Sequence, residues 1–378
     1  MRKETRPIAV FVSFSGTGGV ERMVTSLVRG FVDLGQAVDL VLVKAEGPHL
    51  ARLPPEVEPV RLGTGHTFLA LPALARYLRR RRPAALLAAK DRAGRIAVLA
   101  RRLARTDTRI LIRLGTNLST AMAGRPAYEH WLRYWPIRWL YPQADRLVAV
   151  SEGVARDTAE IARVPRQRIW VIRNPVITPE LAGLAAEPCG HPWLATGEPP
   201  VVLGAGRFQR QKDFPTLIRA FARVRAARPC RLILLGEGKG RHELETLIAE
   251  LGLTGQVDLP GFRTNPFPFL ARAALFVLSS AWEGSPNVLT EALALGTPVV
   301  STDCPSGPRE LLDGGRFGPL VPVGDVAALA RAMTGTLDRH PPREILRSAV
   351  AEYNQAASAR RYLQAMGVAP RAQDQAAG

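Results

Sequence analysis

The sequence predicts an α/β protein with two doubly wound parallel-sheet domains that face a cleft between them. Three observations support this fold class. Short apolar runs alternate with helical patterns, the alternation is interrupted once near the middle, and 378 residues are enough for two domains of roughly 150 residues each. Short, continuously apolar strands separated by helices are typical of parallel sheets that helices cover on both faces.

The first half of the chain predicts one such sheet. The apolar run at Ile8–Phe14 has the length of a buried strand, and helical periodicity follows over Gly19–Leu34. Each later run is again short and is separated from the next by a helical stretch. These further strands are expected at Val38–Val43, Ala84–Ala89, Arg109–Arg113, Leu147–Val150 and Trp170–Ile172.

Residues 178–200 hold five prolines and three glycines without a sustained period, which indicates a linker. The strands expected after it are Val201–Ala205, Arg231–Leu235, Gln256–Leu259, Leu275–Leu278, Pro298–Val300 and Phe317–Val321. The helices expected between them are Phe214–Arg228, Arg241–Leu251, Asn265–Ala273, Asn287–Leu295 and Val326–Leu337, and a last helix covers about Arg343–Gln364.

These patterns predict the domain boundaries. The N-terminal domain is expected to end at residue 180, and a C-terminal helix is expected to pack back on it. The full division is 1–180 for the N-terminal domain, 181–199 for the linker, 200–342 for the C-terminal domain, 343–366 for the C-terminal helix and 367–378 for a disordered tail.

Composition excludes several classes of protein. Apolar residues make up 47% and charged residues 22% of the chain, as in an ordinary globular protein. Three scattered cysteines suit neither a disulfide framework nor a zinc site, so a reducing, cytoplasmic location is expected. The first apolar run is too short for a secretory signal, and no stretch reaches the roughly 18 apolar residues of a membrane-spanning helix.

The net charge of +18 suggests an anionic partner. Residues 1–190 carry 30 basic and 16 acidic side chains, so most of the excess lies in the N-terminal half. A phospholipid surface, a phosphorylated acceptor or a nucleic acid would each fit. A general preference for arginine would give the same excess, since only five of the 51 basic residues are lysine.

One loop of the second domain carries residues that suit a diphosphate. Gly204 lies at the end of a predicted strand and Gly206 directly follows it, and glycines there let the backbone approach a ligand closely. Arg207 and Lys212 place two cations at the same strand exit. A dinucleotide fingerprint is the alternative, but Gln209 stands where its third glycine would be, and a plain structural turn also stays open.

A second loop, EGSPNVLTE at 283–291, joins another predicted strand to a helix. Ser285 is expected to cap this helix, with Pro286 in its first turn. The helix N-terminus and the amides around Gly284 would bind an anion, while the carboxylates of Glu283 and Glu291 would accept hydrogen bonds from sugar hydroxyls. The alternative for Glu291 is a solvated position on the helix surface.

Four motifs resemble one known family. They are GGVER at 18–22, GRFQRQKD at 206–213, EGSPNVLTEALALGTPVV at 283–300 and DCPSGPRELL at 303–312. With them the chain resembles the large family of retaining glycosyltransferases of the GT-B fold, often numbered family 4. The resemblance spans nearly the whole chain, is densest over 200–325, and implies two Rossmann-like domains.

The resemblance also implies a role for each matching residue. Arg207 and Lys212 would neutralise the diphosphate of a nucleotide-sugar donor, and Glu283 would hold hydroxyls of the transferred sugar, so these three are the candidate catalytic residues. Glu291 would bind the ribose hydroxyls. The other candidate donor-binding residues are Gly18 and Gly19 at the phosphates, Gly261, Phe262 and Arg263 beside the nucleobase, and Gly206, Gly284, Ser285, Pro286, Asn287 and Val288.

The implied reaction is retaining transfer of a hexose or N-acetylhexosamine from a nucleotide sugar to a saccharide or lipid-linked saccharide of the cell envelope. UDP is the favoured nucleotide, because DCPSGPREL is common in relatives that use UDP-sugars. Charge develops on the departing diphosphate, so fixed cations and helix-end amides are the main means of catalysis. No Asp-x-Asp pair is present, and neither a metal nor a cofactor is expected.

The N-terminal domain departs from the family pattern. Many relatives carry a histidine after a central strand, whereas the corresponding strand exit here reads RLGTN at 113–117. Arg113, Thr116 or Asn117 would occupy that region. His66 and His130 are the other candidates, and each is more often a surface histidine.

Two features of the basic half suggest a membrane surface. Residues 76–82 read RYLRRRR, and Trp131, Trp135 and Trp139 recur every four positions with arginines between them. Tryptophan with arginine suits a membrane–water interface, which predicts a peripheral enzyme on the inner face of the membrane. The alternatives are a helix that packs its tryptophans on the sheet and a solvated arginine-rich helix end.

Two other functions stay open. One is another GT-B enzyme, such as a nucleotide-sugar epimerase, which would bind a similar ligand. The other is a basic nucleic-acid-binding protein, motivated by the net charge. That function predicts aromatic residues interleaved with basic ones on a sheet or a recognised module, and since neither is found, no nucleic-acid partner is expected.

Overall fold

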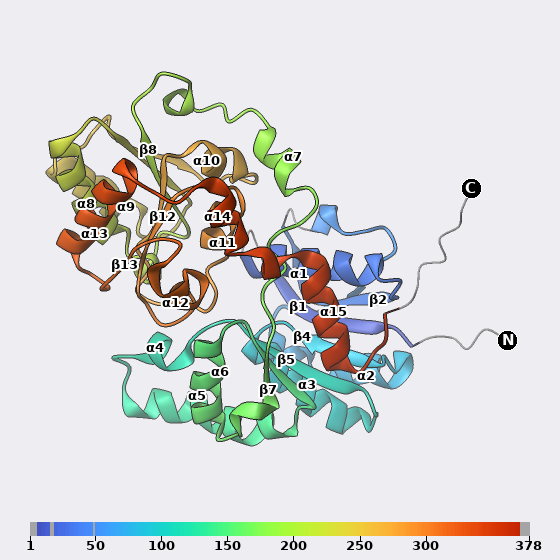
Figure 1. The fold of residues 1–378 in the computed structure, drawn as a ribbon. Coiled ribbons are helices and arrows are strands. Elements are labelled where there is room, and N and C mark those ends of the chain that lie inside the picture. Colours follow the sequence, from blue (N-terminus) through green and yellow to red (C-terminus); the bar gives the residue numbers. More distant parts are fainter. Residues whose placement is uncertain (1–5, 16–18, 48–49, 371–378) are drawn as a thin grey trace, which may run out of the picture. The chain divides into compact units, whose positions relative to one another are not determined.

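The computed structural model describes residues 6–15, 19–47 and 50–370. The chain divides into two compact units (Figure 1). The first unit consists of Met1–Val176 with Glu352–Gly378, and the second of Ile177–Ala351. Each unit contains one parallel sheet, so the predicted fold class is confirmed.

The first unit has a seven-stranded sheet in the order β3-β2-β1-β4-β5-β6-β7. Its strands are β1 Ile8–Ser15, β2 Val38–Glu46, β3 Glu58–Arg61, β4 Ala85–Ala88, β5 Arg109–Leu114, β6 Arg146–Ala149 and β7 Ile169–Val171. Its helices are α1 Gly19–Asp33, α2 Leu71–Arg81, α3 Asp91–Ala104, α4 Leu118–Met122, α5 Ala127–Leu140, α6 Glu152–Ala162 and α15 Gln355–Met366. Two apolar clusters pack against this sheet, and α1 and α15 contribute to one of them.

The second unit has a six-stranded sheet in the order β10-β9-β8-β11-β12-β13. Its strands are β8 Val201–Ala205, β9 Arg231–Leu235, β10 Val257–Gly261, β11 Leu275–Leu278, β12 Val299–Thr302 and β13 Leu320–Val321. Its helices are α7 Leu181–Ala186, α8 Phe214–Ala227, α9 Arg241–Glu250, α10 Phe267–Arg272, α11 Asn287–Ala294, α12 Pro308–Leu311, α13 Val326–Asp338 and α14 Arg343–Ser348. A third apolar cluster, formed entirely by this unit, is its core.

The C-terminal helix packs on the N-terminal domain, as predicted, but it is not one helix. The segment expected as a single helix contains α14 in the second unit and α15 in the first. Asn354 starts α15 anew, because its side chain accepts a hydrogen bond from the amide of Ala357 at 2.7 Å. Gly367, at φ 67°, and Val368 then close α15 with a left-handed cap, while 371–378 of the expected disordered tail lie outside the described residues.

The segment predicted as a linker contains structure of its own. Residues 181–199 include α7 and the short 3-10 helix Pro192–Leu194, and they belong to the second unit. Leu181 is buried, and α7 packs against α10. The chain passes between the units at Val176–Ile177 and again at Ala351–Glu352.

Candidate functional site

The predicted donor loops of the second unit leave neighbouring strands. The chain order of the sheet reverses between β8 and β11, which pair in parallel. Loop 206–212 follows the carboxyl end of β8, and loop 279–286 follows that of β11. Ligands of open α/β sheets bind beyond the carboxyl ends of strands at such a reversal, so the topology brings the two loops to the expected place.

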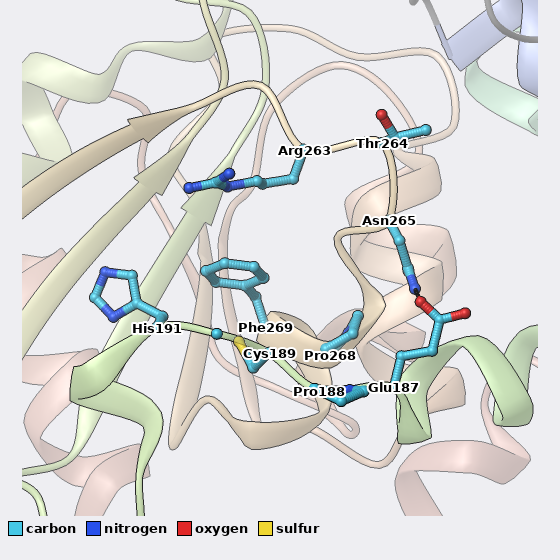
Figure 2. Close-up of a pocket in the computed structure, with 10 residues that line it drawn as sticks. Glu187, Pro188, Cys189, His191, Arg263, Thr264, Asn265, Pro268 and Phe269 are labelled. Atoms are coloured by element: carbon cyan, nitrogen blue, oxygen red, sulfur yellow. Dashed lines mark hydrogen bonds between the residues drawn. The ribbon is translucent and has the colours of Figure 1, made fainter.

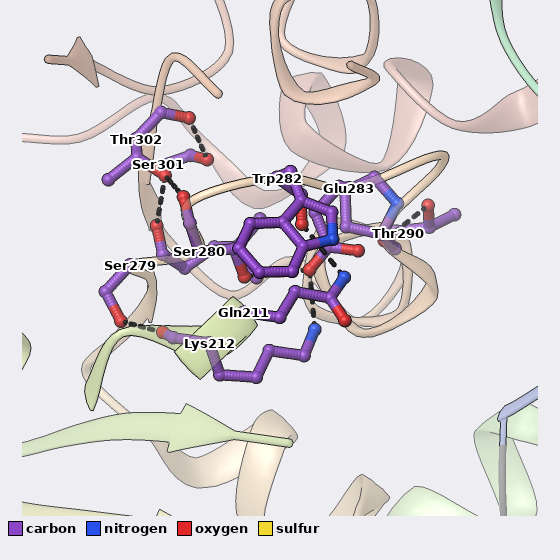
Figure 3. Close-up of polar contacts among 11 residues, drawn as sticks. Gln211, Lys212, Ser279, Ser280, Trp282, Glu283, Thr290, Ser301 and Thr302 are labelled. Atoms are coloured by element: carbon purple, nitrogen blue, oxygen red, sulfur yellow. Dashed lines mark hydrogen bonds and ion pairs between the residues drawn. The ribbon is translucent and has the colours of Figure 1, made fainter. Parts of the chain in front are cut away.

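Lys212 and Glu283 form an ion pair between these loops (Figure 3). The Nζ atom of Lys212 lies 2.6 Å from Oε1 of Glu283, and the two side chains are only 16% and 9% exposed. The hydroxyl of Ser280 donates to the same carboxylate oxygen at 2.8 Å. Two of the three predicted catalytic residues therefore meet in a largely buried, charged site.

Further hydrogen bonds hold the two loops together. The hydroxyl of Ser279 donates to the carbonyl of Lys212 at 2.7 Å, and the side-chain amide of Gln211 donates to the carbonyl of Trp282 at 2.9 Å. Sequence reasoning missed these residues and Ser280. The signal that could have found them is a pair of serines directly after an apolar strand, because polar side chains at that position face the strand exit.

The absence of a side chain at Gly206 leaves space for the side chain of Lys212. Its φ is 156°, and a Cβ atom built there would lie 2.8 Å from Cε and 3.0 Å from Cδ of Lys212. The backbone of Gly236, in the loop after β9, closely approaches that of Gly206. A Cβ atom built at Gly236 would lie 1.9 Å from the carbonyl oxygen of Gly206. Gly204, by contrast, lies inside β8 against Leu234, so its role is packing rather than ligand approach.

The loop before α11 differs in one detail from the prediction. The helix starts at Asn287 with Pro286 at the capping position, so the prediction that Ser285 caps it is wrong. The reason is that the carbonyl of Pro286 already accepts hydrogen bonds from the amides of Leu289 and Thr290. Gly284 and Pro286 are buried, whereas Ser285, Asn287 and Val288 are half-buried.

Glu291 lies in the interior of the second unit. It is 2% exposed, so the alternative of a solvated position on α11 is excluded.

Arg207 lies in the loop after β8 and is exposed, and its guanidinium makes no hydrogen bond or ion pair with the part of the chain that the structure describes. Arg207 is therefore a cation still available to a ligand.

One of the three predicted nucleobase residues, Arg263, lines a small pocket (Figure 2). Gly261 ends β10 with φ 85°, and Phe262 is 42% exposed. Arg263 lines the pocket, with its guanidinium carbon 6.0 Å from the centroid of the Phe269 ring. The pocket has a volume of about 250 Å³ and is closed on the other side by Cys189 and its neighbours in the segment before β8.

The charges of the site affect a nearby thiol. Cys304 is buried, and its burial, followed by the negative charge of Glu283, raises the pKa of the thiol to about 12. The thiol is therefore protonated at neutral pH and supplies no nucleophile there. The cation of Lys212 opposes this shift without cancelling it.

The first unit has a comparable ion pair at its own strand reversal. Gly18 lies outside the described residues, and Gly19 is the first residue of α1. In the same helix Glu21 is 3% exposed, and its Oε1 lies 3.3 Å from Nζ of Lys90, which follows β4. Sequence reasoning missed this pair, although lysines are scarce in the chain.

The strand exit that lacks the family histidine is occupied by residues with structural contacts. Arg113 is 4% exposed, donates to a buried asparagine at 2.8 Å, and has its pKa lowered by burial. Asn117 caps α4 with its side chain, and Thr116 is exposed. His66 is exposed, and His130 packs edge-on against a tyrosine, so neither histidine shows a site role.

The described residues contain no group of three or more His, Cys, Asp and Glu side chains placed to hold a metal ion. No helix in 6–15, 19–47 and 50–370 is both long and apolar enough to cross a membrane. The predicted site residues of the second unit are thus a lysine, an exposed arginine, two buried carboxylates and a helix N-terminus, groups that suit an anion and hydroxyl groups.

Comparison with known proteins identifies two family models along the chain. Residues 17–179 match the model described as Glycosyltransferase Family 4, and residues 199–339 match the model described as Glycosyl transferases group 1. The first match covers the sheet of the first unit except β1, and the second covers the sheet and site loops of the second unit.

Two of the chain's relatives are named as glycosyltransferases. The chain is 30% identical over 344 residues to N-acetylgalactosamine-N,N'-diacetylbacillosaminyl-diphospho-undecaprenol 4-alpha-N-acetylgalactosaminyltransferase of Campylobacter jejuni, covering 88% of this chain and 90% of that one. It is 35% identical over 200 residues to a lipopolysaccharide core biosynthesis glycosyltransferase of Rhizobium meliloti, covering 53% of this chain and 56% of that one.

Solved structures share the fold. An Anabaena protein, HepE, in complex with UDP and glucose superposes with a TM-score of 0.73 at 18% identity, covering 96% of this chain and 99% of that one. A lipopolysaccharide outer core galactosyltransferase, WaaB, superposes with a TM-score of 0.70 at 18% identity, covering 95% and 98%. At these identities the likeness establishes the GT-B fold and no substrate.

Proposed function

The chain belongs to the family 4 glycosyltransferases, and from that premise we propose that it transfers a hexose or N-acetylhexosamine from a UDP-sugar, with retention of configuration, to a saccharide or lipid-linked saccharide of the cell envelope. The observation that carries the proposal is the Lys212–Glu283 pair at the strand reversal of the second unit. In this pair a cation lies within one hydrogen bond of the carboxylate that we propose to bind the sugar.

The comparisons support the substrate classes. The Campylobacter jejuni relative is named for an undecaprenol-linked acceptor, and the Rhizobium meliloti relative for lipopolysaccharide core biosynthesis. A structural neighbour binds UDP and glucose. These names favour a nucleotide-sugar donor and an acceptor of the cell envelope for this chain as well.

The ion pair suggests how the donor is received. Lys212 donates to Glu283 and neutralises its charge. We propose that a bound diphosphate attracts Lys212, together with exposed Arg207, and thereby frees the Glu283 carboxylate to accept hydrogen bonds from the sugar. Donor binding would then replace the Lys212–Glu283 contact by two others, one between Lys212 and the diphosphate and one between Glu283 and the sugar hydroxyls. The buried carboxylate of Glu283 would therefore never be left without a partner.

The chemical step follows from this arrangement. The bond between the anomeric carbon and the diphosphate breaks, and its electron pair goes to the diphosphate oxygen. The acceptor hydroxyl attacks the same face of the sugar and gives its proton to the departing diphosphate. Arg207, Lys212 and the amides at the start of α11 would stabilise the negative charge that develops there, so we propose that the reaction requires neither a metal nor another cofactor.

The location follows from the acceptor and the charge. We propose that the enzyme works as a peripheral protein at the cytoplasmic face of a membrane, where lipid-linked saccharides are available. The excess of basic residues in the N-terminal half favours an anionic surface.

A panel of nucleotide sugars tests the donor. UDP-sugars should raise the unfolding temperature, GDP- and ADP-sugars should not, and EDTA should leave the shift unchanged; at a hundred times Kd the gain is about 2.7 kcal/mol. Stabilisation by GDP-sugars instead would overturn the UDP assignment, and a shift that EDTA abolishes would overturn metal independence. Incubation with the donor and no acceptor separates a transferase from an epimerase, because only an epimerase would then produce an isomeric nucleotide sugar.

A further inference from the structure

Helix α5 is apolar on two opposite faces. On its inner face Ile137 and Leu140 are buried in the core of the first unit. Arg133 reaches inward as well, where its Nη2 lies 2.9 Å from Oδ2 of Asp91, and Arg138 donates to the carbonyl of Ile161 on α6 at 3.2 Å. These contacts fix the rotation of α5 about its axis, so its other face must point away from the core.

The outer face of α5 carries five large apolar side chains. Their spacing of three and four residues places them on one side of the helix. The five are Tyr128, Trp131, Leu132, Trp135 and Trp139, which are 63%, 61%, 59%, 54% and 49% exposed and which we call the tryptophan ridge. The three indole rings stack in a row, with centroids 6.2 and 6.3 Å apart. The alternative that the tryptophans pack the helix on the sheet is therefore excluded.

Arginines continue the ridge at one end. The guanidinium of Arg102, on α3, lies 5.3 Å from the centroid of the Trp139 ring. The next residue, Leu103, is 53% exposed and accepts a hydrogen bond through its carbonyl from Arg79 on α2 at 3.1 Å. Arg80 and Arg82 are exposed on the same arginine-rich end of α2. The outer surface of α5, α3 and α2 is thus apolar at one end and basic at the other.

This combination fits an anionic membrane better than a nucleic acid. Soluble proteins seldom leave a continuous row of large apolar side chains uncovered without a binding role. Indole rings and arginines favour the headgroup region, where the rings meet the acyl chains and the guanidinium groups meet phosphates. Leu103 and Leu132 offer no ring on which a base could stack, but they would gain from contact with acyl chains.

We propose that the tryptophan ridge lies in the headgroup region of a membrane containing anionic phospholipid, with Arg79, Arg80 and Arg102 beside lipid phosphates. This assignment rests on the proposed membrane location and names the surface through which the protein would bind the membrane. It would hold the first unit against the layer in which a lipid-linked acceptor is anchored.

Vesicle flotation without donor tests the surface. Wild-type protein should float with vesicles of phosphatidylcholine and phosphatidylglycerol, and far less with phosphatidylcholine alone. The variant W131Q/W135Q/W139Q should bind at least about tenfold more weakly, and R79S/R80S should lose about fivefold per arginine at low salt. Ile345→Ser in α14, which removes another exposed apolar side chain at 45% exposure, is the matched control and should bind like wild type.

The outcomes separate the surface from the location. If wild-type protein does not float at low salt, both the membrane location and the ridge assignment fail. If wild type and the triple variant float equally, the location stands and the ridge is refuted. Equal unfolding temperatures of variant and wild type show that folding is intact, and a blue shift of tryptophan emission on vesicle addition reports insertion by a second route. Tight binding to RNA with no vesicle binding would also overturn the proposal.

Discussion

The ion pair between Lys212 and Glu283 determines how single substitutions at the site should behave. Lys212→Ala removes the cation and leaves the Glu283 carboxylate with the hydroxyl of Ser280 as its remaining described partner. We expect the transfer rate to fall roughly 100- to 1,000-fold, as on loss of one charge-stabilising donor. We also expect the free energy of unfolding to fall by about 1–3 kcal/mol, because the buried Glu283 carboxylate loses its positively charged partner.

Steady-state transfer and urea unfolding of the same preparation measure both effects. Lys239→Ala is the matched control, since Lys239 is an exposed lysine of the same unit, and it should leave both the rate and the stability unchanged. Lys212→Arg should keep most of the stability. Near-normal turnover of Lys212→Ala would remove Lys212 from the diphosphate.

Residue types predicted the principal charged residues of the site but not the residues that form hydrogen bonds with them and between their loops. Lys212 and Glu283 could be found because a scarce cation and a carboxylate follow strands in recognisable motifs. Gln211 could not, because its contact with Trp282 depends on β8 and β11 being neighbours, which strand order along the chain does not reveal. Ser280 contacts Glu283 within its own loop and could have been found from the serine pair that follows β11. The prediction for Ser285 is wrong because the helix begins one residue later than the motif suggests, with Pro286 at the N-cap position and no side-chain cap.

Among the helices and strands, the pairing of α1 with α15 offers a direct test. Gly30 lies at their crossing, where a Cβ atom would come within 2.9 Å of Cβ of Ala359 and 3.2 Å of Cγ of Gln355. Gly30→Val should therefore push α15 away and lower the free energy of unfolding by about 1–3 kcal/mol. Gly335→Ala in α13, where a Cβ meets no atom within 4 Å, should instead stabilise the protein slightly.

Urea denaturation of the two variants and wild type measures this difference. Equal stability of Gly30→Val and wild type would show that α15 does not need the close approach to α1. Because Gly30 lies outside the donor loops of the second unit, thermal stabilisation by UDP should survive the substitution.

Apolar runs predicted the buried strands well and the marginal elements poorly. The strand β3, Glu58–Arg61, was missed because it lies at the sheet edge, contains a proline and has no apolar run. The sequence of α7 resembles a linker because six residues between prolines show no sustained period. Periodicity does not give the orientation of the tryptophans on α5, since a helix with two apolar faces has no single direction that it can indicate.

The apolar cores of the two units differ in how much of the chain they need. The core of the second unit draws only on residues between Val202 and Met333, one continuous stretch of chain. One core of the first unit also needs α15, which supplies Tyr362, Leu363 and Met366 from the far end of the sequence. The second unit is therefore continuous in sequence, whereas the first is completed only after the whole chain has been made.

This division predicts different behaviour of two fragments. Fragment 177–351 keeps a complete sheet and core, so it should unfold cooperatively and be stabilised by UDP through Arg207, Lys212 and Glu291. Fragment 1–176 lacks α15, which exposes apolar surface on α1 and the sheet, so it should aggregate or unfold without a cooperative transition. Circular dichroism melting of both fragments, with and without UDP, measures this. A stable fragment 1–176 would show that α15 is dispensable to the fold, and a folded fragment 177–351 that ignores UDP would mean that nucleotide binding needs the first unit as well.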